Sequence, residues 1–580
     1  MKADLPKREP EVLRFWTEKR IYERIVESGR GKPRFILHDG PPYANGNIHL
    51  GTALNKILKD IVMKSKNMFG FLCEFIPGWD CHGLPIELQV EKELGEKKKA
   101  MTKVEVRRTC RAYAEKYITI QREEFQRLGG LGRWKEPYLT MSFPYEARIA
   151  REFSRVVRNG GVYREKKPVT WCPSCETALA EAEVEYEDHT SPSIYVAFPF
   201  PEAEKALSRL KGEDVSVAIW TTTPWTIPAN LAICLHPQLE YVAVKILKQG
   251  KPKGGVPITG RVLILLGALL DKVMKELAVE EYELIGLIYF KNLEGLKARH
   301  PLYGKDSVLL PADYVSQEEG TGCVHTAPGH GMEDYITGKE FRLEVYSPVD
   351  SRGRFTSDVQ FFGGKNVFEA NADVVEELRK KGALLAEGKL SHSYPHCWRC
   401  KNPVIFRATE QWFISMENKG LRQSALKEIR AVTWIPPWGQ NRIEGMVSVR
   451  PDWCISRQRA WGVPIVVFYC EACGKELLDP GVIDAMAQRF EAHGSDLWYE
   501  KTAGDLLLPG TNCPACGGKR FQKEEDILDV WFEAGVSHTA VLEPRKEWPA
   551  DLYLEGSDQH RGWFHTSLLH SVATRGRAPY

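Results

Sequence analysis

The chain has 580 residues, 43% of them hydrophobic and 27% charged, and its formal net charge at pH 7 is +2. This length exceeds one ordinary core, so three or four domains of a globular protein are expected. No apolar run approaches the ~18 residues that cross a bilayer, which excludes a membrane partner, and the balanced charge excludes a strongly basic nucleic-acid coat while leaving local RNA binding open.

The N-terminal region alternates helical and strand patterns. Apolar spacing predicts helices over 11–28 and 104–128, and the apolar run at 35–37 predicts a buried strand of a parallel sheet. A turn that contains glycine follows at 41–52. The next helix is predicted to carry its apolar residues on one face: Leu54, Ile57, Leu58, Ile61 and Val62.

The turn delivers His49 to the start of that helix. Free N–H groups and a partial positive charge at a helix start suit a phosphate, to which an imidazole adds a hydrogen bond. On this pattern alone, a histidine that only caps a neighbouring loop is an equal alternative.

Two basic segments come next, at 92–103 and 107–122. Taken alone they are most typical of a solvated helical hairpin. The alternative is a local phosphate-binding patch, which a net charge near zero does not exclude.

The chain changes character near residue 191. Short β-branched and aromatic runs, separated by turn residues, occur at 193–198, 215–220, 241–246, 261–266 and 307–310. They predict a compact strand-rich domain, expected as a closed barrel. The expected domains are therefore 1–190, an insertion at 191–390, and 391–580, where strands again alternate with amphipathic helices.

Eight of the 14 cysteines form four Cys-x-x-Cys pairs: Cys172 and Cys175, Cys397 and Cys400, Cys470 and Cys473, Cys513 and Cys516. The N-terminus shows no export signal, so a cytoplasmic location without disulfides is expected. Two pairs make a closed tetrahedral zinc site, and two structural zinc ions are predicted, with redox dithiols or idle thiols as the alternatives.

The spacing of these pairs suggests two different sites. The last two pairs lie close together and predict a small zinc ribbon at about 465–520. The first two pairs would join the two ends of the insertion if they share a metal. Sequence alone leaves the other pairings open.

Four motifs resemble those of the class I aminoacyl-tRNA synthetases, and among them most closely those of the isoleucyl-tRNA synthetase family. The residues at 49–52, His-Leu-Gly-Thr, are similar to the family's His-x-Gly-His, with Thr52 in place of the second histidine. The segments at 77–87, 455–465 and 555–564 carry the rest of the resemblance, which extends over essentially the whole chain. It implies an α/β fold, a Rossmann-type parallel sheet split by the large inserted domain.

The resemblance implies a two-step reaction. ATP activates isoleucine to isoleucyl-adenylate, and the isoleucyl group then passes to tRNA-Ile, with Mg²⁺ as the counter-ion of the polyphosphate. The protein supplies positioning and charge stabilisation. The implied catalytic residues are His49, Gly51 and Thr52, at the phosphates and adenine.

The implied substrate-binding residues have distinct roles. Asp80 would bind the α-ammonium of isoleucine, Glu555 the ribose of ATP, and Gln559 the amino acid. Pro41, Trp531 and Trp563 would enclose the aliphatic side chain of isoleucine. Without the resemblance, a turn-capping Asp80 and ordinary core tryptophans are the simpler interpretations.

The insertion resembles the family's hydrolytic editing domain. One methylene is worth only about 1–3 kcal/mol to an apolar pocket, a limit known for these very enzymes, so valine needs a second site. The implied editing residues are Thr221, Thr222, Thr223, Thr226, Asn230, His325 and Asp334. Asp334 would bind the α-ammonium of a mischarged valine, and His325 and the threonines would place a water and limit size. Exposed strand hydroxyls and a satisfied loop histidine are the alternatives.

The family's Lys-Met-Ser-Lys-Ser motif and anticodon-binding domain are not found in this sequence. The chain is therefore expected to be incomplete for adenylation, and a monomer. Two other functions stay open at this point: a valyl- or leucyl-tRNA synthetase relative, and a non-catalytic zinc-ribbon protein that binds RNA.

Overall fold

The computed structural model describes residues 4–580, so the first three residues of the predicted domain 1–190 lie outside it. The chain divides into two compact units. Unit 1 contains the chain up to Arg164, the short segment 180–182, and Trp412–Tyr580. Unit 2 contains Glu165–Leu179 and Glu183–Gln411, so the predicted insertion 191–390 falls inside it.

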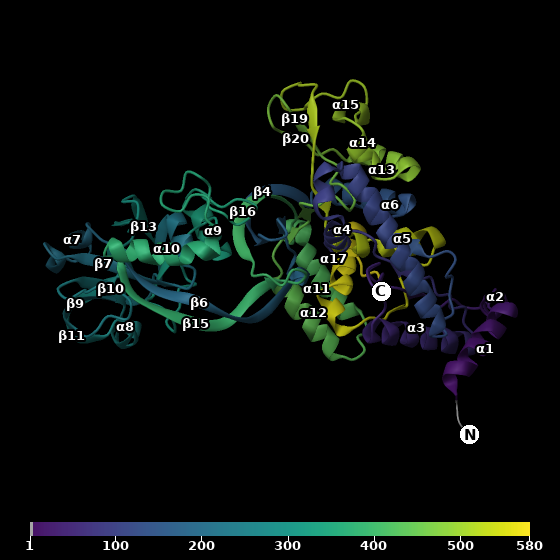
Figure 1. Ribbon diagram of the computed structural model, residues 1–580, viewed down its shortest axis with the longest axis horizontal. Coiled ribbons are helices and arrows are strands. Elements are labelled where there is room, and N and C mark those ends of the chain that lie inside the picture. The colour runs from purple at the N-terminus through teal and green to yellow at the C-terminus, as the bar shows by residue number, and fades with distance from the viewer. Residues whose placement is uncertain (1–3) are drawn as a thin grey trace. The chain divides into compact units, whose positions relative to one another are not determined.

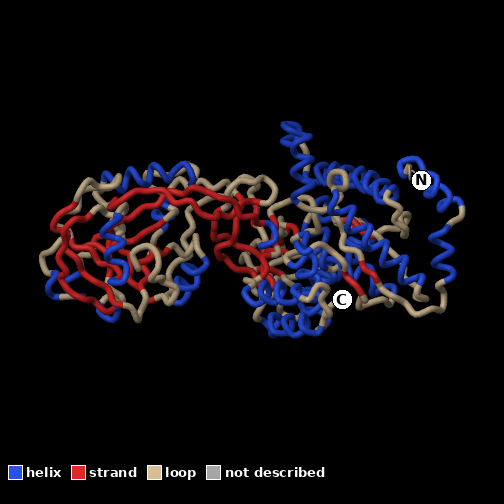
Figure 2. Tube along the Cα trace, turned by 90° about the horizontal axis from the view of Figure 1, so that it is seen from below, coloured by secondary structure: helices blue, strands red, loops and turns tan. Residues whose placement is uncertain are grey.

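Unit 1 is mainly helical (Figure 2). Its helices are α1 (Leu5–Glu18), α2 (Ile21–Ser28), α3 (Leu50–Met68), α4 (Leu84–Leu94), α5 (Lys103–Arg127), α6 (Phe143–Arg158), α11 (Leu421–Ala431), α12 (Trp438–Val449), α13 (Pro480–His493), α14 (Leu497–Glu500), α15 (Ala503–Leu506), α16 (Val530–Gly535) and α17 (Trp563–Arg575). None of the helices over residues 4–580 is both long and apolar enough to cross a membrane.

The strands of unit 1 are short: β1 (Leu37–His38), β2 (Gly78–Trp79), β3 (Tyr138–Leu139), β17 (Trp453–Cys454), β18 (Ser456–Arg457), β19 (Phe468–Cys470), β20 (Glu476–Leu477), β21 (Phe521–Lys523), β22 (Ile527–Leu528) and β23 (Leu552–Tyr553). β1 pairs in parallel with β23, and β2 with β3. The first of these ladders joins segments more than 500 residues apart in sequence and places the turn before α3 beside the turn after β23.

Unit 2 is rich in strands (Figure 2). They are β5 (Thr177–Ala178), β6 (Val184–Pro199), β7 (Val215–Thr221), β8 (Ala232–Leu235), β9 (Glu240–Gln249), β10 (Val262–Leu266), β11 (Val279–Tyr289), β12 (Lys297–Arg299), β13 (Asp306–Pro311), β14 (Cys323–Thr326) and β15 (Leu384–Cys397). The helices are α7 (Ala203–Ala206), α8 (Leu270–Glu276), α9 (Met332–Glu340) and α10 (Val367–Lys380). β4 (Val162–Cys172) and β16 (Ile405–Ile414) carry the chain between the units.

Two sheets organise unit 2. The larger has the order β11-β9-β10-β7-β6-β15, and the smaller β12-β13-β8-β14. β6 and β15 run side by side as the two longest strands (Figure 1), paired from Val196 and Leu384 to Val184 and Cys397. All five strands predicted in this region are present, whereas closure into a barrel stays a prediction.

Three expectations about unit 1 were wrong in detail. The helix predicted over 11–28 is two helices, because Arg20 adopts a left-handed φ of 51° and interrupts the chain of hydrogen bonds. The strand predicted at 35–37 is centred instead on Leu37–His38. The basic hairpin is not wholly solvated, since Arg107 is fully buried and donates to Asp496 at 2.6 Å and to the Gly462 carbonyl at 2.7 Å.

The face of α3 that enters the core differs from the predicted one. The apolar residues lie on one face, but Leu54 is 59% and Ile61 56% exposed. The buried face carries Lys56, Lys59 and Met63. Burial of two lysines is possible because the carboxylates of Asp39, directly after β1, and of Glu555, beyond β23, meet them inside the fold.

Candidate functional site

The start of α3 is built around His49. His49 is the N-cap, and its Nδ1 accepts hydrogen bonds from the backbone N–H of Gly51 at 3.1 Å and of Thr52 at 3.4 Å. The Thr52 hydroxyl in turn accepts from the His49 N–H at 2.9 Å and completes a capping box. A Cβ at position 51 would lie 2.9 Å from Cε1 of His49, so glycine leaves room for the imidazole. His49 is exposed, and Nε2 is the ring nitrogen left for a ligand.

Four buried charges lie behind this helix start. Lys59 bridges two carboxylates: its Nζ lies 2.5 Å from Asp39 Oδ1 and 2.6 Å from Glu555 Oε1. Lys56 also pairs with Asp39. Burial lowers the pKa of Lys56 to about 8, whereas the two carboxylates raise the pKa of Lys59 despite its burial.

Glu555 is held in one orientation by this arrangement. Its Oε1 also accepts from the Gly40 N–H at 2.9 Å, and its Oε2 accepts from the Asn55 amide at 2.7 Å. A Cβ at position 40 would lie 2.5 Å from Glu555 Oε1, which explains the glycine there. Burial raises the pKa of Glu555, and Lys59 opposes that rise.

Asp80 directly follows β2. Its N–H donates to the Pro42 carbonyl at 2.9 Å, and Thr140 Oγ1 donates to its carboxylate at 3.4 Å. Pro41 therefore lies between Gly40, which contacts Glu555, and Pro42, which contacts Asp80. Burial raises the pKa of Asp80 to about 8, and the charge of Glu533 adds to the rise. A cationic ligand would restore the ionised form.

The other three predicted substrate-binding residues meet around Gly562. A Cβ at that position would lie 2.6 Å from Gln559 Oε1 and 2.8 Å from Trp531 Cζ3. Gln559 Oε1 accepts from the backbone N–H of Trp563 at 2.9 Å. The Trp563 ring is buried and stacks on Tyr553 with centroids 4.1 Å apart.

Unit 1 thus brings most of its predicted site residues together in two groups. Glu555 joins Gly40 next to Pro41, and Trp531, Gln559 and Trp563 surround Gly562. His49 stands apart: among residues 4–580 its side chain makes hydrogen bonds only with its own helix start. Two residues, Asp39 and Lys59, were missed by reasoning from the sequence. Lys59 pairs with both Asp39 and Glu555 and so holds the Glu555 carboxylate in place. The one signal in the sequence was the presence of two lysines, Lys56 and Lys59, on the same face of one helix.

Unit 2 contains a cavity of about 350 Å³ at the ends of β7 and β14. Six of the seven residues predicted for the insertion line it: Thr221, Thr222, Thr223, Thr226, His325 and Asp334. Asn230 is fully buried behind His325 and does not line the cavity. The lining also includes residues for which no role was predicted, among them Trp220, Tyr314, Ser316 and His330.

Hydrogen bonds connect the polar residues of this cavity. His325 contacts Thr226 Oγ1 through Nε2 at 2.9 Å and Asn230 Nδ2 through Nδ1 at 2.8 Å. The Thr221 and Thr223 hydroxyls are 3.3 Å apart. His330 donates from Nδ1 to the Phe406 carbonyl at 2.9 Å. Burial lowers the pKa of His325 to about 3 and of His330 to about 4, so both rings are neutral at pH 7.

Asp334 supplies the carboxylate that opens onto the cavity. It lies in the first turn of α9, and its Oδ2 accepts from the Ala327 N–H at 2.8 Å. Partial burial raises the pKa of Asp334 to about 6, and the neighbouring Glu333 adds to that rise. The carboxylate is therefore mostly ionised at pH 7 and suits an ammonium ligand.

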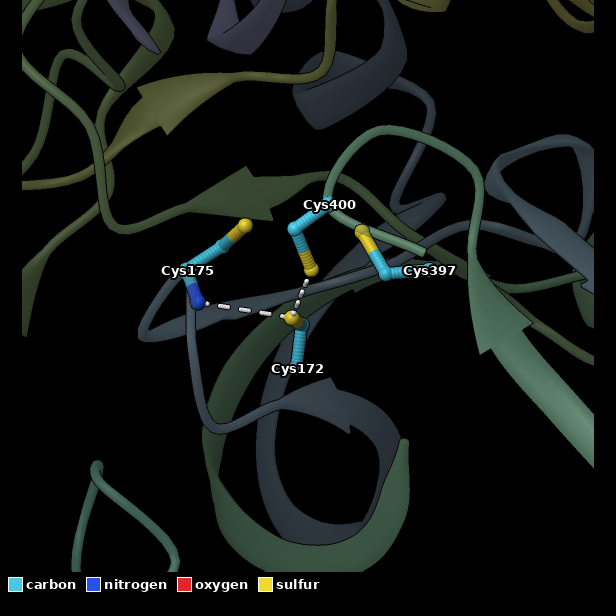
Figure 3. A group of neighbouring side chains, drawn as sticks. All are labelled: Cys172, Cys175, Cys397 and Cys400. Atoms are coloured by element: carbon cyan, nitrogen blue, oxygen red, sulfur yellow. Dashed lines mark hydrogen bonds between the residues drawn. The ribbon is translucent and has the colours of Figure 1, made fainter. Parts of the chain in front are cut away.

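The eight predicted metal ligands form two groups of four. Cys172, Cys175, Cys397 and Cys400 converge in unit 2 (Figure 3), with Cys172 Sγ and Cys400 Sγ 3.5 Å apart. In unit 1, the second group has Cys470 Sγ 3.5 Å from Cys516 Sγ and Cys473 Sγ 3.6 Å from Cys513 Sγ. Tetrahedral zinc with Zn–S bonds of ~2.3 Å separates its sulfurs by about 3.8 Å, so both groups fit zinc.

Comparison with known proteins points to the same family as the sequence motifs. Residues 11–580 match the family model described as "tRNA synthetases class I (I, L, M and V)". The whole chain aligns with isoleucine–tRNA ligases: 57% identity over 584 residues with that of Syntrophotalea carbinolica, 58% over 583 with that of Geobacter sulfurreducens, and 54% over 582 with that of Moorella thermoacetica.

The relatives are longer than this chain. The aligned region covers 62% of the first two relatives and 61% of the third, so the chain spans about three fifths of their length. A solved LeuRS–tRNA complex from Agrobacterium radiobacter aligns with 98% of this chain and 64% of that chain, at 17% identity and a TM-score of 0.40.

Proposed function

Because the chain belongs to the class I tRNA synthetases of the isoleucine, leucine, methionine and valine group, we propose that its activity is that of an isoleucine–tRNA ligase. Identity above 50% to isoleucine–tRNA ligases over the whole chain supports isoleucine rather than valine or leucine. The same match argues against a non-catalytic zinc-ribbon protein, which would have no use for the buried carboxylates of the site.

The proposed fold follows from the same membership. Unit 1 forms a Rossmann-type core around the parallel β1–β23 ladder, and the barrel-like editing domain is inserted as part of unit 2. The ribbon is the three-stranded sheet β20-β19-β21 with its four cysteines. Zinc, held by the two groups of cysteines, contributes folding free energy and no chemistry.

The proposed activation step uses unit 1. His49, at the start of α3, contacts the phosphates of ATP through Nε2, with Mg²⁺ as counter-ion, and Glu555 accepts a hydrogen bond from the ribose. Asp80 binds the ammonium of isoleucine, while Pro41, Trp531 and Trp563 enclose its side chain and Gln559 contacts it. Thr52 is fully used in capping His49, so its share in binding phosphate is the weakest of these roles.

The proposed second activity is hydrolysis of valyl-tRNA-Ile in the cavity of unit 2. Asp334 binds the ammonium of valine, and the threonine hydroxyls donate to the ester carbonyl, which increases its reactivity toward water. His325 and the threonines limit the size of the side chain. The observation that carries this proposal is the convergence of six implied residues on one cavity of suitable volume.

The remaining partners are tRNA-Ile, isoleucine and ATP. We propose that the chain acts as a monomer in the cytoplasm.

Hydrolysis tests the editing proposal. The chain is incubated with Val-tRNA-Ile and with Ile-tRNA-Ile, and release of the amino acid is followed, with Asp334→Asn as the variant and Glu333→Gln, its exposed neighbour, as the matched control. We expect release of valine but not isoleucine, lost in Asp334→Asn and kept in the control. Equal release of both amino acids, or none above the variant, would reject the proposal.

A further inference from the structure

Asn230 occupies a position that links three strands. It lies two residues before β8, the strand that separates β13 from β14 in the smaller sheet. The register pairs Ala232 with Val308 on one side and with Thr326 on the other. Ser307 and His325, one residue before each partner, therefore both come within reach of the Asn230 side chain.

The hydrogen bonds of Asn230 fix the orientation of its amide. Nδ2 donates to the Ala232 carbonyl at 2.8 Å, and because a carbonyl can only accept, the amide nitrogen must lie on that side. The second N–H of Nδ2 points to Nδ1 of His325 at 2.8 Å. Oδ1 accepts from the hydroxyl of Ser307 at 2.8 Å. Asn230 and Ser307 are both fully buried, so no water competes for these groups.

The direction of each bond then determines the tautomer of His325. Nδ1 faces an N–H donor and must be the unprotonated nitrogen, so the proton is on Nε2. Nε2–H donates to Thr226 Oγ1 at 2.9 Å, and Thr226 donates to the Thr223 carbonyl at 2.8 Å. The chain of hydrogen bonds thus ends at a backbone carbonyl on each side, that of Ala232 and that of Thr223. Nδ1 of His325 already accepts a hydrogen bond and Nε2 carries the proton, so neither ring nitrogen has a lone pair free for a ligand.

We propose that Ser307, which lies outside the cavity, and Asn230 are positioning residues that hold His325 as the Nε2–H tautomer, so that His325 takes up no proton during hydrolysis. The proposal rests on the editing function proposed above. The cavity therefore offers hydrogen-bond donors to the substrate, from the hydroxyls of Thr221 and Thr223. These hydroxyls are 3.3 Å apart and that of Thr223 is 3.4 Å from that of Thr226, contacts long enough to be exchanged for a ligand.

The tautomer is measured without reference to activity. The full chain is labelled with ¹⁵N-histidine, and two-bond ¹H–¹⁵N correlations report which ring nitrogen carries the proton; the His325 signals are those lost in His325→Gln. We expect an unprotonated Nδ1 in the wild type and in Ser307→Thr, and a protonated Nδ1 in Asn230→Asp, whose carboxylate can only accept. Ser307→Ala leaves Asn230 Oδ1 without its donor, and we expect both tautomers there.

Hydrolysis of Val-tRNA-Ile gives the second readout. Loss of one buried hydrogen bond is expected to lower kcat about three- to tenfold in Ser307→Ala, with KM within about twofold because Ser307 does not touch the cavity. Ser307→Thr should restore kcat. Ser216→Ala, at a buried serine of β7 outside the cavity lining, is the matched control and should leave kcat unchanged.

The two readouts separate the possible failures. A protonated Nδ1 in the wild type overturns the proposal whatever the activity is. Active wild type with unchanged kcat in Ser307→Ala also overturns it while leaving the editing function intact. An inactive wild type with the expected tautomers rejects the editing function and leaves the positioning by Asn230 and Ser307 in place.

Discussion

Lys59 offers the sharpest test of the buried charge network in unit 1. In Lys59→Met, Asp39 keeps Lys56 and the Gly78 N–H, but Glu555 Oε1 keeps only the Gly40 N–H. Breaking a buried ion pair by removing one partner costs about 3–5 kcal/mol, because the remaining charge is left without compensation. The retained hydrogen bonds place the expected loss near the lower end, at about 3 kcal/mol.

Lys56→Met is the matched control. It lies on the same helix and is also buried, but after its removal Lys59 still bridges both carboxylates. Its lowered pKa shows that burial already disfavours its charge. The expected loss is therefore smaller, below about 2 kcal/mol.

Amide hydrogen exchange measures this loss locally, which avoids assigning one unfolding free energy to a chain of two units. Peptides that cover α3 and β23 should exchange faster in Lys59→Met by the factor that corresponds to about 3 kcal/mol, and much less so in Lys56→Met. Equal protection in the wild type and Lys59→Met, or a larger effect of Lys56→Met, would refute the assignment of Lys59 as the bridge.

Two further predictions concern metal and pH. Metal analysis should find two zinc ions per chain and one in Cys172→Ser, and an unchanged zinc content in Cys172→Ser would contradict the first site. Cys172→Ser should also destabilise the chain more than Cys473→Ser, because the first site closes a longer loop. Cys172 and Cys400 are 228 residues apart and Cys470 and Cys516 only 46, which corresponds to a difference in loop-closure free energy of about 1.5 kcal/mol. The kcat/KM for hydrolysis of Val-tRNA-Ile should fall about tenfold per unit as pH drops below about 6, because Asp334 is protonated there. The same protonation stabilises the fold as pH falls from about 6 toward 3.8, since the unfolded chain keeps that carboxyl ionised, so the stability of the chain relative to Asp334→Asn should rise over this range, and a fall in this difference would contradict this origin.

The local features of this chain could be predicted from its sequence. Short β-branched runs such as 215–220 became strands, and the cysteine pairs came together as the spacing indicated. These signals depend on neighbouring residues, or on chemistry with few alternatives, and need no knowledge of distant partners.

Features that depend on distant partners could not be predicted. The buried face of α3 is the clearest case: its lysines enter the core only because Glu555, 496 residues beyond Lys59 in sequence, meets them there. A periodicity analysis counts lysine as a surface residue and places the leucines inside. Ser307 was missed for the same reason: it lies 77 residues from its partner Asn230 and belongs to none of the motifs that carry the resemblance.

The affinity for adenylate analogues tests the central claim most directly. Calorimetric titration of the chain with non-hydrolysable isoleucyl-, valyl- and leucyl-adenylate analogues should give the tightest binding for the isoleucyl compound, and about 1–3 kcal/mol weaker binding for the valyl one. Asp80→Asn should weaken all three. Tightest binding of the valyl or leucyl analogue would contradict the assignment of this chain to isoleucine, and so would equal binding of the analogues by the wild type and Asp80→Asn.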